Sequence, residues 1–323
     1  MSKAKTSAIE AIILVFNLIV YRIDAFLYNF YDLNIVLTGS VILLNKLEII
    51  EISYRQFLVY LLVVPLLIHF LYAIVYIAND YVDYEKVVKL PREKFVYYMY
   101  RPLVFFNKSI LISIVLSLLY ILCSLLMIKI LKLPIGPYAI AIPPLIVIST
   151  FRSISSGFLK HALFGVLRIV KYSYIVISLQ LLLLQGIHLP TFLILVTGYL
   201  IPYAVYHTVE YIVLLKDTSL SDLIRLRDRV KTIVISVIML TSFFLSFLIS
   251  HNYGYAFDGI KYLLLIYGIV VVPGVGLYLL SSTIFKFTKR KKASTFHSFL
   301  VQRFINAIVA FLWCSLIAYC IVM

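Results

Sequence analysis

Long apolar segments recur along the whole chain, and they limit it to one class of fold. A helix that crosses a bilayer needs about 20 largely apolar residues, and nine segments of this kind can be drawn through the 323 residues. Apolar residues make up 63% of the chain and charged residues 13%, whereas soluble domains average about 45–50% and about 25%. One compact core cannot hide that much apolar surface from water. We therefore expect an all-α polytopic membrane protein.

The nine segments define the expected spanning helices. They are Phe26–Leu44, Phe57–Ala78, Ile110–Ile130, Tyr138–Thr150, Leu163–Leu184, Thr191–Leu215, Thr232–Ser250, Ile260–Leu280 and Phe304–Val322. A further segment, Ser7–Tyr21, is shorter and is interrupted by Glu10 and Asn17. This favours an amphipathic helix lying at the membrane interface over a tenth span. The expected organisation is an interfacial segment at 1–21 and a transmembrane domain at 22–323.

Basic residues alternate between rich and poor loops, and this predicts the orientation. The net charge is +15, and most Lys and Arg lie after the second, fourth, sixth and eighth segments. Cytoplasmic loops carry such an excess, so we expect a cytoplasmic N-terminus and an external C-terminus in the cell membrane. The basic residues occupy short loops between apolar runs, a pattern typical of attraction to anionic headgroups. A nucleic-acid partner is not expected.

The first polar cluster directly follows the second segment. Asn79, Asp80 and Asp83 continue the helix, so Asn79 and Asp83 share one face, a turn apart. Carboxylates at the end of a membrane helix are costly unless something neutralises them. Oxygen ligands of this kind suit Mg²⁺, which keeps several waters and bridges to substrate phosphates. The sequence therefore predicts a magnesium site at this end of the second helix.

A second cluster closes the sixth segment on the same predicted side. It comprises Lys216, Asp217 and Asp222. Two acidic helix ends that face each other could hold a magnesium diphosphate, and Arg101, Lys160 and Lys216 in the same layer could bind its phosphates. The alternative is that these charges are solvated ion pairs at the headgroup level. Their joint occurrence on one side favours a site.

At these residues the chain resembles the UbiA superfamily of intramembrane prenyltransferases. The family's first motif, Asn-Asp-x-x-Asp-x-x-x-Asp, is matched at Asn79, Asp80 and Asp83, with Val87 in the last acidic position. Other matches are Arg101-Pro102-Leu103, the Arg22, Phe26 and Asn29 spacing, Leu159-Lys160, and Lys216-Asp217 of the second motif, whose next two acids fall on Leu220 and Ile224. The resemblance covers the chain from Arg22 to the ninth segment.

The resemblance implies a nine-helix bundle and a specific activity. Members transfer a polyprenyl group from its diphosphate to a lipid-soluble or amphiphilic acceptor, such as an aromatic acid, a quinone precursor or a glycerol-phosphate lipid. By analogy, magnesium would be held by Asn79, Asp80, Asp83, Asp217 and Asp222, and Arg101, Lys160 and Lys216 would contact the diphosphate. Arg22 and Asn29 would line the acceptor side. Asp80, Asp83, Asp217 and Lys160 are the expected catalytic residues.

Other functions remain open at this level. A transporter, or a non-catalytic relative that binds isoprenoid lipid, is favoured by the acids missing at Val87, Leu220 and Ile224. Transporters, however, usually carry ionisable groups near the bilayer centre, and the charged clusters here lie at the predicted cytoplasmic edge. A CDP-alcohol phosphotransferase is disfavoured because its Asp-Gly motif is absent. His69 and His207 are expected to be hydrogen-bonded interior histidines.

Overall fold

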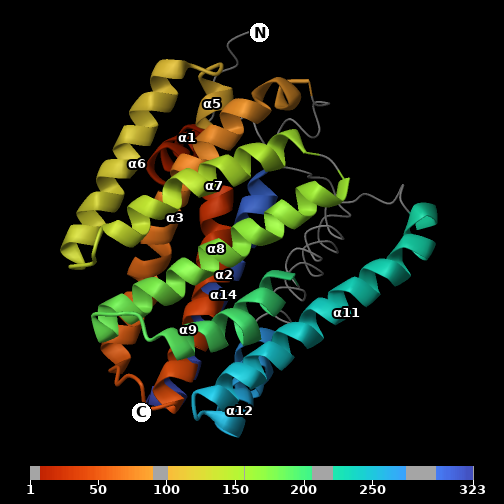
Figure 1. The fold of residues 1–323 in the computed structure, drawn as a ribbon. Helices are drawn as coiled ribbons and strands as arrows, with labels where there is room; N and C mark the ends of the chain where they lie inside the picture. Colours follow the sequence, from red (N-terminus) through yellow and green to blue (C-terminus); the bar gives the residue numbers. More distant parts are fainter. Residues whose placement is uncertain (1–7, 90–100, 156, 206–220, 274–295, 323) are drawn as a thin grey trace.

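The structure of the chain is a computed structural model. The structure describes residues 8–89, 101–155, 157–205, 221–273 and 296–322 (Figure 1). Every regular element within these stretches is a helix. The expected all-α class is therefore confirmed for the part of the chain that the structure describes.

The helices lie close to the predicted segments. Their bounds are α1 Ala8–Val20, α2 Ile23–Lys46, α3 Tyr54–Val87, α5 Pro102–Phe105, α6 Ile110–Ile130, α7 Gly136–Ile154, α8 Gly157–Leu184, α9 Leu189–Leu195, η1 Val196–Leu200, α11 Ser221–Asn252, α12 Ala256–Ile266, η2 Tyr267–Val271 and α14 Phe296–Val322. The longest, α3, begins with a capping box, in which Ser53 and Gln56 satisfy each other's backbone amide groups. It carries Pro65 in its interior and extends through Asn79, Asp80 and Asp83.

Six helices in the described part are long and apolar enough to cross a membrane. They are α2, α3, α6, α7, α8 and α14. Two shorter apolar helices cover Leu189–Val205 and Val237–Asn252. A multi-pass membrane protein is therefore supported by length and composition, and the total of nine spans remains a prediction.

Side-chain contacts give the relative directions of the helices around α2. Arg22 pairs with Asp80 and Asn29 with His69, so α2 and α3 are antiparallel. On α8, Arg168 contacts Tyr28 and Tyr172 contacts Asp32, so both helices advance in the same direction. On α14, Arg303 contacts Tyr28 and Phe311 stacks on Phe30. Thus α8 and α14 run parallel to α2. These directions agree with the alternation predicted for the first, second, fifth and ninth spans.

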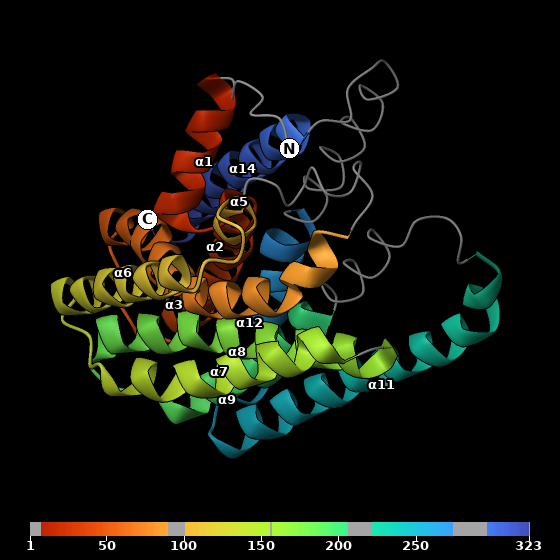
Figure 2. The same cartoon turned by 90° about the horizontal axis from the view of Figure 1, so that it is seen from above.

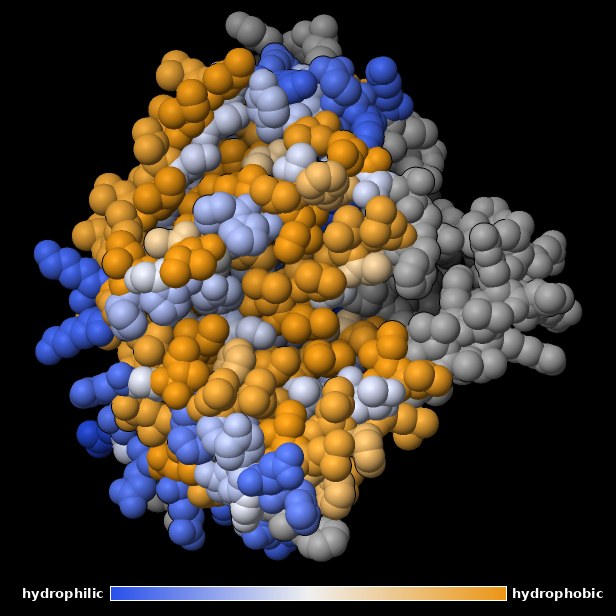
Figure 3. All heavy atoms as spheres, in the orientation of Figure 1, coloured by the Kyte–Doolittle hydropathy of each residue, from blue (hydrophilic) through white to orange (hydrophobic). Residues whose placement is uncertain are grey.

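The bundle is organised around α2, whereas α6 lies on its outside. All residues from Tyr31 to Leu44 of α2 are buried. By contrast, α6 exposes a row of large apolar side chains, including Leu111, Leu118 and Leu122. In Figures 1 and 2, α6 lies along the edge of the bundle, and the face seen in Figure 3 is largely apolar, with hydrophilic residues gathered toward its margins. Such an apolar exterior suits contact with lipid tails rather than water.

Two helices each contain a π-helical turn, and the turns are in contact. The Tyr267 hydroxyl, from η2, donates to the carbonyl oxygens of Gly198 and Tyr199 in η1, at 3.2 and 3.3 Å. A π turn disturbs the regular backbone pattern, and this hydroxyl supplies a partner for the carbonyls. Tyr199 in turn donates to the Ile35 carbonyl of α2 at 2.8 Å. The π turns are thereby fixed against the central helix.

Candidate functional site

The turn between α1 and α2 delivers two side chains to the end of the bundle. Tyr21 and Arg22 both adopt positive φ, 37° and 68°, a conformation uncommon for residues other than glycine. The turn is closed by the Asn17 side chain, which accepts a hydrogen bond from the Ile23 amide at 2.7 Å. This bond satisfies one of the free amides at the start of α2. Tyr21 and Arg22 are thereby presented to α3.

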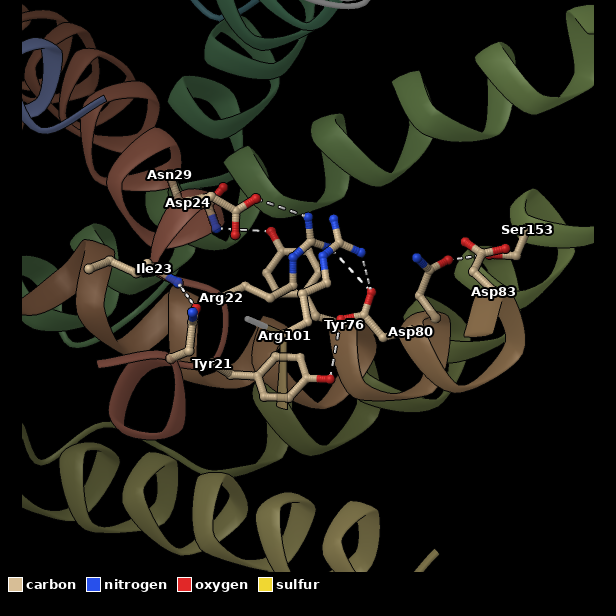
Figure 4. Close-up of polar contacts among 12 residues, drawn as sticks. Tyr21, Arg22, Ile23, Asp24, Asn29, Tyr76, Asp80, Asp83, Arg101 and Ser153 are labelled. Carbon is tan, nitrogen blue, oxygen red and sulfur yellow. Dashed lines mark hydrogen bonds and ion pairs between the residues drawn. The ribbon is translucent and has the colours of Figure 1, made fainter. Parts of the chain in front are cut away.

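Asp80 and four neighbouring side chains are referred to below as the outer cluster: Tyr21, Arg22, Asp24, Asp80 and Arg101 (Figure 4). Asp80 Oδ1 receives Arg101 at 2.7 Å and Arg22 at 3.5 Å. Its Oδ2 receives the Tyr21 hydroxyl at 3.2 Å, and Arg22 also pairs with Asp24 at 3.3 Å. The Asp80 side chain is 1% exposed, whereas Arg22 and Arg101 are 15% and 13% exposed. The buried Asp80 carboxylate therefore contacts two guanidinium groups, and both arginine side chains still reach the surface.

The protonation states in the outer cluster follow from burial and from these pairs. Burial, together with the Asp80 carboxylate, raises the pKa of the Tyr21 hydroxyl well above its ordinary value. Burial lowers the pKa of Arg22, but the carboxylates of Asp24 and Asp80 outweigh this effect and raise it. At neutral pH, Tyr21 is thus a neutral hydrogen-bond donor and Arg22 is a cation.

Asn79 and Asp83, the other residues of the first motif, face a different neighbour. The Ser153 hydroxyl, at the end of α7, donates to the Asn79 side-chain oxygen and lies 3.5 Å from Asp83 Oδ2. Lys86 lies 3.6 Å from Asp83 and donates to the Ser153 carbonyl at 2.7 Å. The motif is therefore divided, with Asp80 turned to the arginines and Asn79 and Asp83 turned to α7.

The described residues meet only part of a magnesium ligand set. Among them, no three or more His, Cys, Asp or Glu side chains lie close enough together to hold a metal ion. Asn79 and Asp83 nevertheless direct oxygens toward the same serine hydroxyl. Mg²⁺ commonly uses one or two carboxylates together with phosphate oxygens and water. The arrangement thus fits a phosphate-bound magnesium better than a cage made only of protein ligands.

The remaining predicted site residues are placed less completely. Lys216 and Asp217 fall in 206–220, outside the described residues, as does His207. Lys160 lies in the first turns of α8, and Asp222 lies in the first turn of α11 rather than in a loop, but their side chains are outside the description. Figures 1 and 2 show the start of α11 standing apart from the rest of the described bundle. The meeting of the two acidic motifs stays a prediction.

A second polar group lies inside the bundle, where none was predicted. It is referred to below as the inner cluster and comprises Asn29, Asp32, Lys171 and Tyr172. Lys171 Nζ lies 3.4 Å from Asp32 Oδ2, and the Tyr172 hydroxyl donates to the same oxygen at 2.5 Å. Asp32 and Lys171 are 0% and 5% exposed. Both lie inside predicted spans, so the ionisable residues are not confined to the predicted cytoplasmic edge, contrary to the expectation from the sequence. A signal was available, because charged residues within apolar segments usually face the bundle interior.

Asn29 belongs to the inner cluster and connects it to the outer one. Its amide oxygen accepts from Lys171 at 3.0 Å, and its amide nitrogen lies 2.9 Å from the Tyr76 hydroxyl and 3.1 Å from His69 Nδ1. The Arg22 guanidinium stands over the Tyr76 ring, 5.3 Å from its centroid. His69 is fully buried, and its Nε2 contacts the Val20 carbonyl. The expectation of a hydrogen-bonded interior histidine at position 69 is confirmed.

Comparison with known proteins adds no relative to this geometry. The chain matches no protein-family model, no curated protein and no solved structure. The described residues form a helical bundle with six helices long and apolar enough to cross a membrane, one charged cluster at a helix end and a second one inside the bundle.

Proposed function

We propose that the chain is a magnesium-dependent intramembrane prenyltransferase. In this proposal it transfers a polyprenyl group from a polyprenyl diphosphate to a lipid-soluble or amphiphilic acceptor. The observation that carries the proposal is the outer cluster, where Arg22 and Arg101 converge on Asp80, which directly follows Asn79 and lies about one turn before Asp83. A guanidinium group can bind a phosphate through two parallel hydrogen bonds. Carboxylate and amide oxygens suit the magnesium that accompanies a diphosphate.

The arginines have a specific part in this mechanism. In the described state, both arginines contact the same Asp80 oxygen, and Arg22 also pairs with Asp24. A diphosphate offers more charge and several oxygens, and it would attract both guanidinium groups away from Asp80. Asp80 would then turn to the ligand's metal, beside Asn79 and Asp83, with Asp217 and Asp222 as the predicted partners from the second motif. Magnesium would supply charge neutralisation for the diphosphate.

In the transfer step, negative charge develops on the diphosphate leaving group, and these residues are proposed to stabilise it. The bond between the prenyl carbon and the diphosphate oxygen breaks and leaves an allylic cation. The acceptor's nucleophilic atom then bonds to the prenyl carbon and loses its proton. Arg22 and Arg101 stabilise the departing diphosphate, because preorganised donors act most strongly where charge develops. Arg22, which the resemblance places on the acceptor side, is assigned to the diphosphate because it contacts the same Asp80 oxygen as Arg101. Lys160 and Lys216 are proposed to assist them.

A transfer assay on membranes containing the full chain tests the proposal. We expect magnesium-dependent consumption of labelled farnesyl diphosphate, reduced at least about 100-fold by Asp83→Asn or Arg101→Gln, since each removes a charged transition-state contact. Glu85→Gln is the matched control, because Glu85 lies on the same helix end but is exposed and pairs only with Lys108 among the described residues. Equal activity in Asp83→Asn and wild type would rule out the metal assignment.

A second candidate function is favoured by the inner cluster. An ion pair within spanning helices is typical of transporters and of proteins that bind polar ligands inside the membrane. In this alternative, the chain binds or moves an isoprenoid lipid without chemistry. Vesicles containing the chain and labelled farnesyl diphosphate distinguish the two. Release across the bilayer that Asp32→Asn abolishes, with no prenyl transfer, would favour the second candidate.

A further inference from the structure

A continuous series of hydrogen bonds joins the inner cluster to the outer one. It passes from Lys171 to Asn29 and divides there toward Tyr76 and His69. Tyr76 lies one helical turn before Asp80 on α3 and beneath the Arg22 guanidinium. The series therefore ends at the edge of the site to which the proposed function assigns the diphosphate.

The chemistry of its ends fixes the direction of every bond. The Lys171 ammonium can only donate, so the Asn29 amide oxygen must face it, 3.0 Å away. The amide nitrogen then has two hydrogens to give, and both Tyr76 Oη and His69 Nδ1 must accept. At the other end, the Val20 carbonyl can only accept, so His69 Nε2 carries the ring proton. Taken together, the two ends require one direction for the series and a neutral imidazole, with Nε2 protonated and Nδ1 accepting.

With the bonds in this direction, the Tyr76 hydroxyl hydrogen has no acceptor in the described part of the chain. The Tyr76 oxygen accepts from Asn29, so its hydroxyl hydrogen is available to a further acceptor. Tyr76 is only partly buried, the Arg22 guanidinium stands over its ring, and the Asp24 carboxylate that pairs with Arg22 also lies near it. An acceptor that binds beside a cation and beside a donor hydroxyl is an oxyanion.

We propose that the Tyr76 hydroxyl donates to a phosphate oxygen of the ligand bound at the outer cluster. Asn29 and Lys171 are positioning residues, because they orient this donor without touching the ligand, and Asp32 holds Lys171 in place. The assignment rests on the proposed function in requiring a phosphate-bearing ligand. The direction of the hydrogen bonds does not depend on that function.

Asn29→Asp is the substitution that would reverse the hydrogen bond between position 29 and Tyr76. A carboxylate keeps the size of the side chain and still accepts from Lys171, but it cannot donate. Tyr76 would then donate to Asp at position 29, and its hydrogen would be lost to the ligand. His69 Nδ1 would also lose its donor and would take up a proton of its own. Nitrogen NMR of the imidazole in the full chain, in nanodiscs and without ligand, reads this change directly.

Binding of inorganic pyrophosphate with Mg²⁺ provides the second measurement. We expect Tyr76→Phe and Asn29→Asp each to weaken binding about tenfold, as for loss of one hydrogen bond to a charged group. The double variant should bind no worse than Tyr76→Phe alone. If Asn29→Asp acted only by charge repulsion, it would still weaken binding in the Tyr76→Phe background. The control is Tyr72→Phe, one turn earlier on α3, whose hydroxyl donates to the Leu167 carbonyl and which should bind as wild type.

The outcomes separate the two proposals. A His69 that carries its proton on Nδ1 in wild type, or additive effects of the two substitutions, would overturn the directional series. Wild type that shows the expected His69 tautomer but binds no pyrophosphate would overturn the proposed function and the ligand assignment, and leave the direction of the hydrogen bonds standing.

Discussion

The outer and inner clusters use the same kinds of side chain in opposite ways. In the outer cluster, two arginines share the single carboxylate oxygen Asp80 Oδ1 and remain partly exposed. In the inner cluster, Lys171 faces Asp32 with both side chains buried, and a tyrosine hydroxyl and an amide complete the set. Arginines that share one carboxylate and reach the surface can exchange partners, whereas a buried pair cannot give up one member without leaving an uncompensated charge. The comparison therefore separates a site suited to ligand exchange from a fixed support beneath it.

The largest expected effect is at the inner cluster. Asp32→Asn leaves the Lys171 ammonium without its carboxylate in the bundle interior and should lower the free energy of unfolding by about 3–5 kcal/mol. Denaturation of the purified chain in mixed detergent micelles measures the loss. The double variant Asp32→Asn/Lys171→Met should recover most of it. A double variant as unstable as the single one would show that the pair is not a fixed support.

Asp80→Asn should have a smaller effect on stability than Asp32→Asn. It removes a charged acceptor from Arg22 and Arg101, for which about 1.5–3 kcal/mol is expected. The loss is limited because both guanidinium groups reach the surface and Arg22 keeps Asp24. The same denaturation measurement applies. A loss equal to that of Asp32→Asn would erase the proposed difference between the clusters.

Removing one tyrosine hydroxyl from each cluster sharpens the comparison. Tyr172→Phe removes a donor 2.5 Å from the buried Asp32 and should cost about 1.5 kcal/mol. Tyr21→Phe removes a donor 3.2 Å from Asp80, which keeps its two arginines, and should cost about 0.5 kcal/mol. Paired melting curves in one detergent give the order. The reverse order would contradict the assignment of the tighter network to the interior.

The smallest effect is expected at the exposed end of α3. Glu85 lies 3.6 Å from Lys108, and its side chain is 63% exposed. Glu85→Gln should change stability by less than about 0.5 kcal/mol, and by less still in high salt. The same unfolding measurement at two salt concentrations sets the baseline for the other variants. A larger loss would mean that charge at this end stabilises the fold on its own.

The sequence predicts helix positions here better than helix partners. The α6 helix has the predicted bounds Ile110–Ile130, because an apolar run of membrane length is a local property. Arg22, Asp80 and Arg101 were each predicted as site residues, yet their convergence depends on a turn with two left-handed residues and on the short α5 helix. Neither has a strong sequence signal.

The pairing of Asp32 with Lys171 could not be predicted from the sequence. Asp32 is the single charge of its apolar segment, and Lys171 shares its own with Arg168, yet both segments remain apolar enough to be predicted as spans. Only the helix packing shows that α2 and α8 run parallel and bring the two charges together. Asn29 was predicted from its spacing to Arg22 and Phe26, but its partners Lys171, His69 and Tyr76 come from other helices. Pairing across helices is the information that a linear pattern lacks.

The packing of α14 against α2 has a consequence for how the protein is made. These are the first and last helices of the described part that can cross a membrane, and they lie side by side through Tyr28 with Arg303 and Phe30 with Phe311. Because α14 follows every other described helix in the chain, the face of α2 that receives it stays uncovered in the translocon or the lipid until α14 has been synthesised. The contact between α2 and α14 therefore forms only after α2 has been inserted. A nascent chain that stalls before Phe296 would leave this face of α2 without its partner helix.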